Sequence, residues 1–486
     1  MPGDYDLVVV ANRLPVDRVE EPDGSTSWRR SPGGLVTALE PVMKREDGAW
    51  VGWAGGAGDE APEPFDAEGV RCVPIPLSEE EVEEYYEGFS NGTLWPLYHD
   101  VIVAPGYHRS WWEAYVRVNE RFAEAAAVQA AQGATVWVQD YQLQLVPRML
   151  RQRRPDLQIG FFNHIPFPPF EIFAQLPWRK AIIDGLLGAD LVGFQRAADA
   201  NNFARACRRA SNLPARAGRI RLDAEGGREV RAASFPISID FRALDELAQR
   251  EDVKARAAEI RRDLGDPEHL LLGIDRLDYT KGILHRLKAF EELLDDGRVD
   301  VAEASLVQVA TPSRERVEQY VQLRQDVEVT VGRINGTHST IAHTAVHYLH
   351  HSYGREEMAA LYLAADVMLV TALRDGMNLV AKEYVASRHD ERGVLVLSEF
   401  TGAADELGGQ ALMVNPHDID GLKDAVLRAL RMPPREAGRR MRALRRRVGD
   451  HDVQRWAASF LEALAQHAPD PRGTAAEVAA SAEASA

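Results

Sequence analysis

The sequence predicts an α/β protein made of two Rossmann-like domains, each with a doubly wound parallel sheet. Its 486 residues exceed what one hydrophobic core usually organises. Short apolar runs alternate with helical patterns, which is typical of parallel sheets buried on both faces. The alternation is interrupted between residues 234 and 264 and then starts again. We therefore expect two domains facing across a cleft that is available as a site.

The predicted elements follow one another in βα order. In the first half they are Leu7–Ala11, Leu35–Arg45, Ala134–Gln139, Leu143–Arg154, Ile159–His164 and Asp190–Phe194. In the second half they are Leu270–Ile274, Ser305–Ala310, Val367–Thr371, Val394–Ser398 and Ala411–Val414. We expect domains over residues 1–236 and 237–451, a helix over 452–468 that crosses back to the first domain, and a disordered tail over 469–486.

The composition excludes several classes of protein. A formal net charge of −17 repels nucleic-acid backbones, so no nucleic-acid partner is expected. Cys72 and Cys207 are too few for a disulfide framework and are predicted to be small buried residues. The first residues lack a basic segment before an apolar one, and no apolar run approaches the ~20 residues of a membrane helix. We expect a cytoplasmic protein with no membrane partner.

Two segments of the first domain place polar side chains where strands end. Arg13 ends the first strand, and Gly33 and Gly34 stand directly before a helix, where a backbone loop approaches a ligand closely. A tight turn with a surface arginine is the alternative. Asp140 and His164 end two later strands and are expected in the same crevice. The prolines after His164 favour a positioning role over proton transfer, and the alternative is a structural histidine, which is the more common role of a lone histidine.

The second domain begins with GIDRLDYTKGI, which places two cations just past a strand. Arg276 and Lys281 suit a diphosphate, since arginine grips phosphate oxygens in a fork and lysine acts as a mobile charge. Both offset the negative charge that builds on a departing nucleoside diphosphate. The alternative is a surface ion-pair loop formed with Asp275 and Asp278.

The segment VTALRDGMNLVAKEYV predicts a strand, a tight turn and a helix that begins near Met377. Asp375 and Glu383 are separated by ~12 Å at 1.5 Å per helical residue, which matches the distance from the sugar ring to the ribose of a nucleotide sugar. The diphosphate is expected between them, at the helix N-terminus, where backbone amides are available to donate. The residues of this turn and first helical turn are Gly376, Met377, Asn378, Leu379 and Val380. A turn aspartate and a solvated glutamate are the alternative.

Two further segments suit the acceptor. Tyr86 and Trp95 are expected near each other, where aromatic faces pack on a sugar ring, with core packing as the alternative. Arg314 follows another strand, so Arg13 and Arg314 are predicted to hold one phosphate from two domains.

These segments resemble the trehalose-6-phosphate synthases, especially the actinobacterial ones. The resemblance rests on ANRLP, SPGGL, EYYEGFSNGTLWPLYH, VQDYQLQLVP, HIPFPP, DRLDYTKG, ATPSRERVE, LRDGMNLVAKEYV and VLSEFTGAADEL, which lie in the family's order over residues 5 to about 465. It implies the GT-B architecture and a retaining transfer of glucose from UDP-, GDP- or ADP-glucose to glucose 6-phosphate. It also implies no metal or other cofactor, and a homo-oligomer, either a dimer or a tetramer, is expected.

The resemblance assigns roles to the candidate residues. Acceptor contacts are implied for Arg13, Trp53, Tyr86, Trp95, Asp140 and Arg314. Donor contacts are implied for Gly33, Gly34, His164, Arg276, Lys281, Tyr353, Asp375, Gly376, Met377, Asn378, Leu379, Val380 and Glu383. Of these, Asp140, His164, Arg276, Lys281 and Asp375 are the predicted catalytic residues.

Three alternative functions remain, and each predicts a different pattern of residues. A related GT-B transferase acting on another sugar or cyclitol phosphate would not need Arg13, Arg314, Tyr86 and Trp95 together. A catalytically silent sugar-phosphate sensor would have a damaged phosphate site. A dinucleotide-binding dehydrogenase would carry GxGxxG after the first strand, where this chain has ANRLP.

Overall fold

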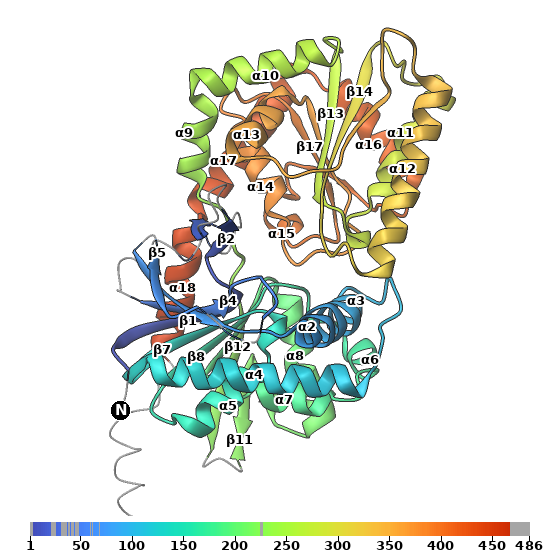
Figure 1. Ribbon diagram of the computed structural model, residues 1–486. Helices are drawn as coiled ribbons and strands as arrows, with labels where there is room; N and C mark the ends of the chain where they lie inside the picture. Colours follow the sequence, from blue (N-terminus) through green and yellow to red (C-terminus); the bar gives the residue numbers. More distant parts are fainter. Residues whose placement is uncertain are drawn as a thin grey trace, which may run out of the picture. The chain divides into compact units, whose positions relative to one another are not determined.

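The computed structural model describes residues 3–20, 26–30, 36, 39, 43, 48–58, 60, 62–67, 69–223 and 227–466. The chain divides into two compact units, unit 1 with Met1–Pro236 and Gln454–Ala486, and unit 2 with Ile237–Val453 (Figure 1). Gly33, Gly34 and the predicted tail over 469–486 lie outside the described residues, as does most of the predicted helix over 35–45. No helix among the described residues is long and apolar enough to cross a membrane.

Unit 1 is built on a ten-stranded sheet whose middle is parallel. The strands are β1 (Tyr5–Arg13), β4 (Ala49–Trp53), β5 (Phe65–Ala67), β6 (Val70–Ile75), β7 (Ala130–Gln139), β8 (Gln158–Asn163), β9 (Leu191–Phe194), β10 (Ala215–Arg216), β11 (Arg219–Leu222) and β12 (Arg228–Ser234). Their order is β10-β11-β12-β9-β8-β7-β1-β4-β6-β5, antiparallel only at the two edges. From β1 the chain runs outward to β4 and β6, and then returns to the other side at β7. The strand order therefore reverses between β1 and β7.

Helices complete unit 1. Along the chain they are α2 (Glu79–Glu81), the π-helical segment η1 (Val82–Leu94), α3 (Trp95–Tyr98), α4 (Arg109–Gln129), the 3₁₀ turn η2 (Tyr141–Leu143), α5 (Val146–Arg153), α6 (Phe170–Phe173), α7 (Arg179–Leu186) and α8 (Ala197–Ser211). The sequence did not predict the antiparallel hairpin of β2 (Val16–Glu20) and β3 (Thr26–Arg30). Its short strands carry charged residues in place of an apolar run.

The last helix, α18 (Val453–Ala465), packs on unit 1. The ring of Phe460 stacks on Trp137 at 4.5 Å between centroids, with an interplanar angle of 6°. A Cβ atom added at Gly160 or Gly193 would lie 2.8 or 2.7 Å from Phe460, so these glycines make room for its ring. Unit 1 is thus completed by a helix that follows unit 2 in the sequence.

Unit 2 is built on a six-stranded, fully parallel sheet. Its strands are β13 (His269–Arg276), β14 (Ala304–Thr311), β15 (Val346–Leu349), β16 (Val367–Val370), β17 (Val394–Ser398) and β18 (Leu412–Val414), in the order β15-β14-β13-β16-β17-β18. In chain order this is 3-2-1-4-5-6, the Rossmann arrangement. The strand order reverses between β13 and β16, where ligands of such folds bind beyond the carboxyl ends of the strands.

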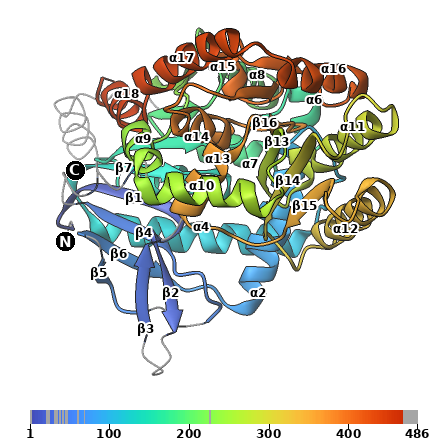
Figure 2. The ribbon, with the colours of Figure 1, turned by 90° about the horizontal axis from the view of Figure 1, so that it is seen from above.

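Helices cover both faces of this sheet. One layer holds α11 (Ile283–Asp295), α12 (Glu318–His338) and α16 (Ile419–Leu430), which contact one another through α11 (Figure 2). The other layer holds α9 (Phe241–Gln249), α10 (Glu251–Asp263), α13 (Arg355–Ala364), α14 (Leu379–Ser387) and α17 (Pro434–Asp450), and the short η4 (Tyr279–Lys281) and α15 (Ala403–Leu407) lie in loops. Leucine, valine and isoleucine side chains between these layers are almost fully buried.

Candidate active site

The reversal point of unit 2 brings a cation and a carboxylate together. Lys281 follows β13 and Asp375 follows β16, and the Lys281 Nζ atom donates to Asp375 Oδ2 at 2.6 Å. The two side chains are only 11% and 14% exposed. Separating a partly desolvated ion pair is costly, because it leaves each charge uncompensated. The two side chains are therefore held firmly together. The structure therefore joins two residues that the sequence placed on separate strand ends.

The loops that carry this pair are tied to each other. The backbone amide of Leu373 donates to the Thr280 carbonyl at 2.7 Å, and Thr371 Oγ1 donates to the Gly282 carbonyl at 3.2 Å. Gly282 has a φ of 64°, and a Cβ there would lie 2.1 Å from the Thr371 carbonyl oxygen. Only glycine fits so close an approach with that backbone.

A buried ion pair also stabilises these loops. Arg286 donates to Asp275 Oδ2 at 2.9 Å and to Gln308 Oε1 at 2.7 Å, and both charged side chains are almost fully buried. Asp275 therefore does not form a surface ion-pair loop, which was the alternative for this motif. Asp278 is 0% exposed and excludes that alternative as well.

The turn after β16 orients Asp375 at the start of α14. Asn378 Nδ2 donates to Asp375 Oδ2 at 3.1 Å, and Asn378 Oδ1 caps the helix by accepting from the Ala381 amide at 3.1 Å. Asn378 has a φ of 77°, so the helix begins at Leu379 and not near Met377 as predicted. The Met377 amide points to Asp375 Oδ1 at 3.4 Å, a long contact within the turn.

Glu383 lies one turn further along α14, beside a buried tyrosine. The Tyr362 hydroxyl donates to Glu383 Oε2 at 2.7 Å. Burial raises the pKa of the Glu383 carboxyl, although the Tyr362 hydrogen bond opposes this. Glu383 is therefore not the solvated helical glutamate of the alternative interpretation. Tyr353 lies before α13, with its ring 4.3 Å from that of His351.

A second cluster surrounds Asp278, which lies between Arg276 and Lys281 in sequence. Asp278 Oδ2 accepts from Arg314 Nη1 at 3.1 Å and from the Tyr320 hydroxyl at 3.0 Å. Burial alone would raise the pKa of the Asp278 carboxyl, but the charges of Arg314, Arg276 and Lys281 outweigh burial and hold the pKa below its ordinary range. Arg276 itself ends β13 and is exposed.

In unit 1, Asp140 and His164 meet at the ends of neighbouring strands. Asp140 follows β7 with a φ of 73°, a backbone conformation that a non-glycine residue adopts only where its surroundings hold it. Its amide donates to the Phe162 carbonyl at 2.7 Å, and its Oδ1 accepts from the His164 amide at 3.0 Å. The two residues, which the sequence placed at the ends of two strands, are therefore in direct contact.

Two glutamines hold the ring of His164. Its Nε2 atom lies 2.9 Å from Gln139 Oε1, and its Nδ1 atom lies 3.3 Å from Gln195 Nε2. An amide oxygen at Nε2 and an amide nitrogen at Nδ1 favour the neutral ring with its proton on Nε2. Burial lowers the pKa of His164 to about 3, which keeps the ring neutral. Neither glutamine was predicted as a site residue, and only the position of Gln139 at the end of an apolar run indicates it.

The acceptor candidates of unit 1 fall into two groups. The guanidinium of Arg13 lies 5.0 Å from the centre of the Trp53 ring, which contacts the Tyr86 ring at 5.6 Å. Trp95 is buried against His99 and Tyr141, at 4.2 and 5.7 Å. Trp53 therefore contacts both Arg13 and Tyr86, whereas the ring contacts of Trp95 are with His99 and Tyr141.

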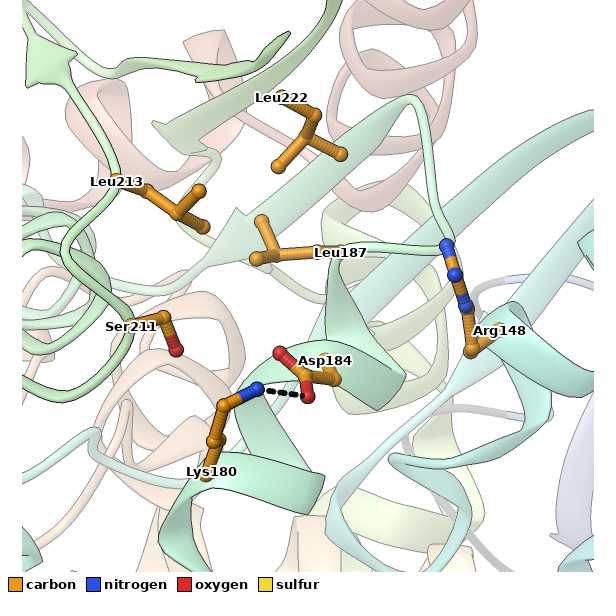
Figure 3. A pocket seen from close by; sticks show the side chains of 7 residues that line it. All are labelled: Arg148, Lys180, Asp184, Leu187, Ser211, Leu213 and Leu222. Atoms are coloured by element: carbon orange, nitrogen blue, oxygen red, sulfur yellow. Dashed lines mark hydrogen bonds and ion pairs between the residues drawn. The ribbon is translucent and has the colours of Figure 1, made fainter. Parts of the chain in front are cut away.

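One hollow of unit 1 contains none of these residues (Figure 3). Its volume is about 260 Å³, and Arg148, Lys180, Asp184, Leu187, Ser211, Leu213 and Leu222 line it. Lys180 Nζ already pairs with Asp184 Oδ2 at 2.7 Å, one helical turn apart. We assign no ligand to this hollow.

Comparisons with known proteins agree with this geometry. The sequence model described as glycosyltransferase family 20 matches residues 5–466. A trehalose-6-phosphate synthase of Mycolicibacterium gilvum is 59% identical over 475 residues, 96% of this chain and 94% of the relative.

Solved structures are similar over nearly the same length. An α,α-trehalose-phosphate synthase (UDP-forming) from Burkholderia xenovorans, in complex with glucose 6-phosphate, is 35% identical with a TM-score of 0.86 and covers 94% of this chain and 99% of that one. A structure from E. coli bound with UDP-2-fluoro glucose is 33% identical with a TM-score of 0.86 and covers 94% and 98%.

The fold and the charged strand ends define the class first: two Rossmann-like units with these neighbours are a glycosyltransferase of the GT-B type. The match over almost the whole chain then gives the family. The chain belongs to glycosyltransferase family 20.

Proposed function

We propose that this chain transfers glucose from a nucleoside-diphosphate glucose to glucose 6-phosphate, giving α,α-trehalose 6-phosphate and a nucleoside diphosphate. The observation that carries the proposal is the Lys281–Asp375 pair at the point where the strand order of unit 2 reverses. A lysine there suits the leaving diphosphate, and a fixed carboxylate suits the hydroxyls of the donor sugar.

We infer a reaction on one face of the donor sugar. The bond from the anomeric carbon to the diphosphate breaks, and the 1-hydroxyl of the acceptor forms the new bond while passing its proton to the leaving phosphate. Arg276 and Lys281 stabilise the charge on that phosphate, and this is the main electrostatic contribution. His164, held neutral, orients the donor glucose and does not transfer a proton, while Glu383 binds the ribose.

The acceptor is assigned to a different set of side chains. Arg13 and Arg314 bind its phosphate, and Tyr86 and Trp53 contact its sugar ring. The contacts of Trp53 with both the Arg13 guanidinium and the Tyr86 ring support this assignment. We also assign acceptor contacts to Trp95 and Asp140. The remaining donor contacts are Gly33, Gly34, Tyr353 and the turn Gly376–Val380 at the start of α14.

The nucleotide, the homo-oligomeric state and a cytoplasmic location stay predictions. The diphosphate is proposed to be bound without a metal, because Arg276 and Lys281 supply the positive charge that a metal would otherwise provide. Activity that survives excess EDTA supports this, and loss of activity that Mg²⁺ restores would contradict it.

One assay tests the proposed function. The purified chain is incubated with glucose 6-phosphate and UDP-, ADP- or GDP-glucose in turn, and nucleoside diphosphate release is measured together with the disaccharide phosphate. Equal amounts of both products are expected with at least one donor. Transfer to another sugar or cyclitol phosphate alone would favour a related transferase, and binding of glucose 6-phosphate without turnover would indicate a sensor.

A further inference from the structure

Tyr320 lies in the first turn of α12, at the end of the segment ATPSRERVEQY, where the sequence offered no reason to assign it a role, and it is 2% exposed. Its hydroxyl donates to Asp278 Oδ2 at 3.0 Å and accepts a hydrogen bond from Arg314 Nη1. Arg314 Nη1 also donates to the same carboxylate oxygen at 3.1 Å. The side chain of Asp278, from the loop after β13, and those of Arg314 and Tyr320, from the segment after β14, therefore form one closed hydrogen-bonded triangle.

The carboxylate corner of this triangle is fixed in place. Asp278 Oδ1 accepts from the Thr280 amide at 2.9 Å and from Thr280 Oγ1 at 2.8 Å. With Tyr320 and Arg314 on its other oxygen, the carboxylate receives four hydrogen bonds and is 0% exposed. A carboxylate held in this way sets the position of any cation bound to it.

The arginine corner has a backbone that needs support. Arg314 has a φ of 50°, in the left-handed region that residues other than glycine seldom adopt. The Tyr320 ring lies beneath its guanidinium at 5.3 Å, and the side chain of Arg314 is only 5% exposed. Tyr320 thus contacts the guanidinium twice, with its ring from below and with its hydroxyl from the side.

We propose that Tyr320 is a positioning residue that, together with Asp278, fixes the guanidinium of Arg314 for the phosphate of the acceptor. This inference rests on the proposed function, in which Arg314 binds that phosphate. Asp278 also lies within the electrostatic reach of Arg276 and Lys281.

The variant Tyr320→Phe keeps the ring under Arg314 and removes only the hydroxyl. We expect it to raise the KM for glucose 6-phosphate about tenfold, the usual consequence of losing one hydrogen bond to a charged group. The KM for the nucleotide sugar and kcat at saturating acceptor are expected within about twofold of the parent. A merely structural role would instead lower Tm and leave both KM values alone.

Tyr384→Phe is the matched control. Tyr384 is also fully buried in unit 2, with a guanidinium, that of Arg388, over its ring at 5.9 Å. Its hydroxyl lies among backbone groups and donates to the carbonyls of Ala365 and Asp366, both at 3.4 Å. This control is expected to leave both KM values unchanged.

Two further variants separate this inference from the proposed function. If Arg314→Ala leaves the KM for glucose 6-phosphate unchanged, the proposed role of Arg314 is wrong. If Arg314→Ala raises that KM but Tyr320→Phe does not, the positioning role of Tyr320 is overturned. A positioning residue has no further effect once its target is gone, so Tyr320→Phe is expected to add nothing in the Arg314→Ala background. Full additivity would mean that Tyr320 acts independently of Arg314, which also overturns the inference.

Asp278→Asn provides a second test, and it serves alone if Tyr320→Phe does not fold. It preserves the size of the side chain but removes the charge that holds Arg314 Nη1. We expect the KM for glucose 6-phosphate to rise at least as much as in Tyr320→Phe. An unchanged KM in a folded Asp278→Asn protein would contradict the proposal.

Discussion

The cations Lys281 in unit 2 and Arg13 in unit 1 form ion pairs of almost equal length in very different surroundings. Lys281 lies 2.6 Å from Asp375 and Arg13 lies 2.8 Å from Asp17. The first pair is 11% and 14% exposed, whereas the second is 43% and 34% exposed. An exposed pair contributes about 0–1 kcal/mol, and breaking a buried one costs about 3–5 kcal/mol. Burial, and not distance, decides that Lys281 is fixed before a ligand binds while Arg13 is free to adjust.

The largest effect is expected from Lys281→Ala. The variant loses the charge assigned to the leaving diphosphate, so kcat is expected to fall about 10²- to 10³-fold. Lys423→Ala is the matched control, since Lys423 is also a poorly exposed lysine of unit 2 that pairs with Glu292, Asp296 and Asp420. Steady-state turnover of both proteins checks this, and equal losses would mean that Lys281 has no special role.

Glu383→Gln is expected to raise the KM for the nucleotide sugar about thirtyfold. The neutral amide keeps one acceptor oxygen for the ribose hydroxyls, so the expected loss is that of about one charged hydrogen bond, which contributes about 1.5–3 kcal/mol. The Tyr362 hydroxyl donates to one oxygen of Glu383, Oε2, and not to the ligand. Tyr362→Phe is therefore expected to have a smaller effect in the same direction. Donor titrations at saturating acceptor measure both. A rise in the acceptor KM alone would contradict the assignment.

Lys281 and Arg13 are expected to respond differently when each is replaced by the other type of cation. Arg13→Lys is expected to raise the KM for glucose 6-phosphate only about three- to tenfold. The exposed site accommodates a lysine, which keeps the charge but does not bind a phosphate in a bidentate way. Lys281→Arg is expected to lower kcat far more, because a larger group replaces a side chain that is only 11% exposed. Arg71→Ala, which removes an exposed partner of Asp66, is the control for unit 1. The comparison fails if both exchanges have the same effect.

The smallest effect concerns the stability of unit 1 towards acid. The pKa of His164 is about 3 in the folded chain and about 6.5 in the unfolded one, so the unfolded state binds more protons between these values. The free energy of unfolding therefore falls as the pH drops through 6.5. His164→Asn should remove about 1 kcal/mol of this loss between pH 7.5 and 5.5. Denaturant titrations at both pH values measure it, and an identical pH dependence in parent and variant would contradict it.

The sequence was sufficient to predict the residues that stand at strand ends. Apolar runs mark β7, β13 and β16, so Asp140, Arg276 and Asp375 could be placed at the edge where ligands bind. The start of α14 was misplaced because Asn378 adopts a left-handed backbone, which no periodicity reveals. The contacts of Tyr320 were also beyond prediction, since 42 residues separate it from Asp278. Contacts between buried polar groups depend on how the elements pack together, and local patterns in a single sequence do not reveal that packing.

The place of Phe460 has a consequence for how the chain acquires its structure. On the ribosome, all of unit 2 emerges before α18 does, so unit 2 is able to fold while unit 1 still lacks its last helix. Until then the ring of Trp137 and the hollows at Gly160 and Gly193 have no cover from Phe460. Unit 1, which is synthesised first, is thus completed only when the last helix has emerged. A chain cut short at residue 452 would lack α18 and expose the apolar surface that Phe460 covers, which would favour aggregation.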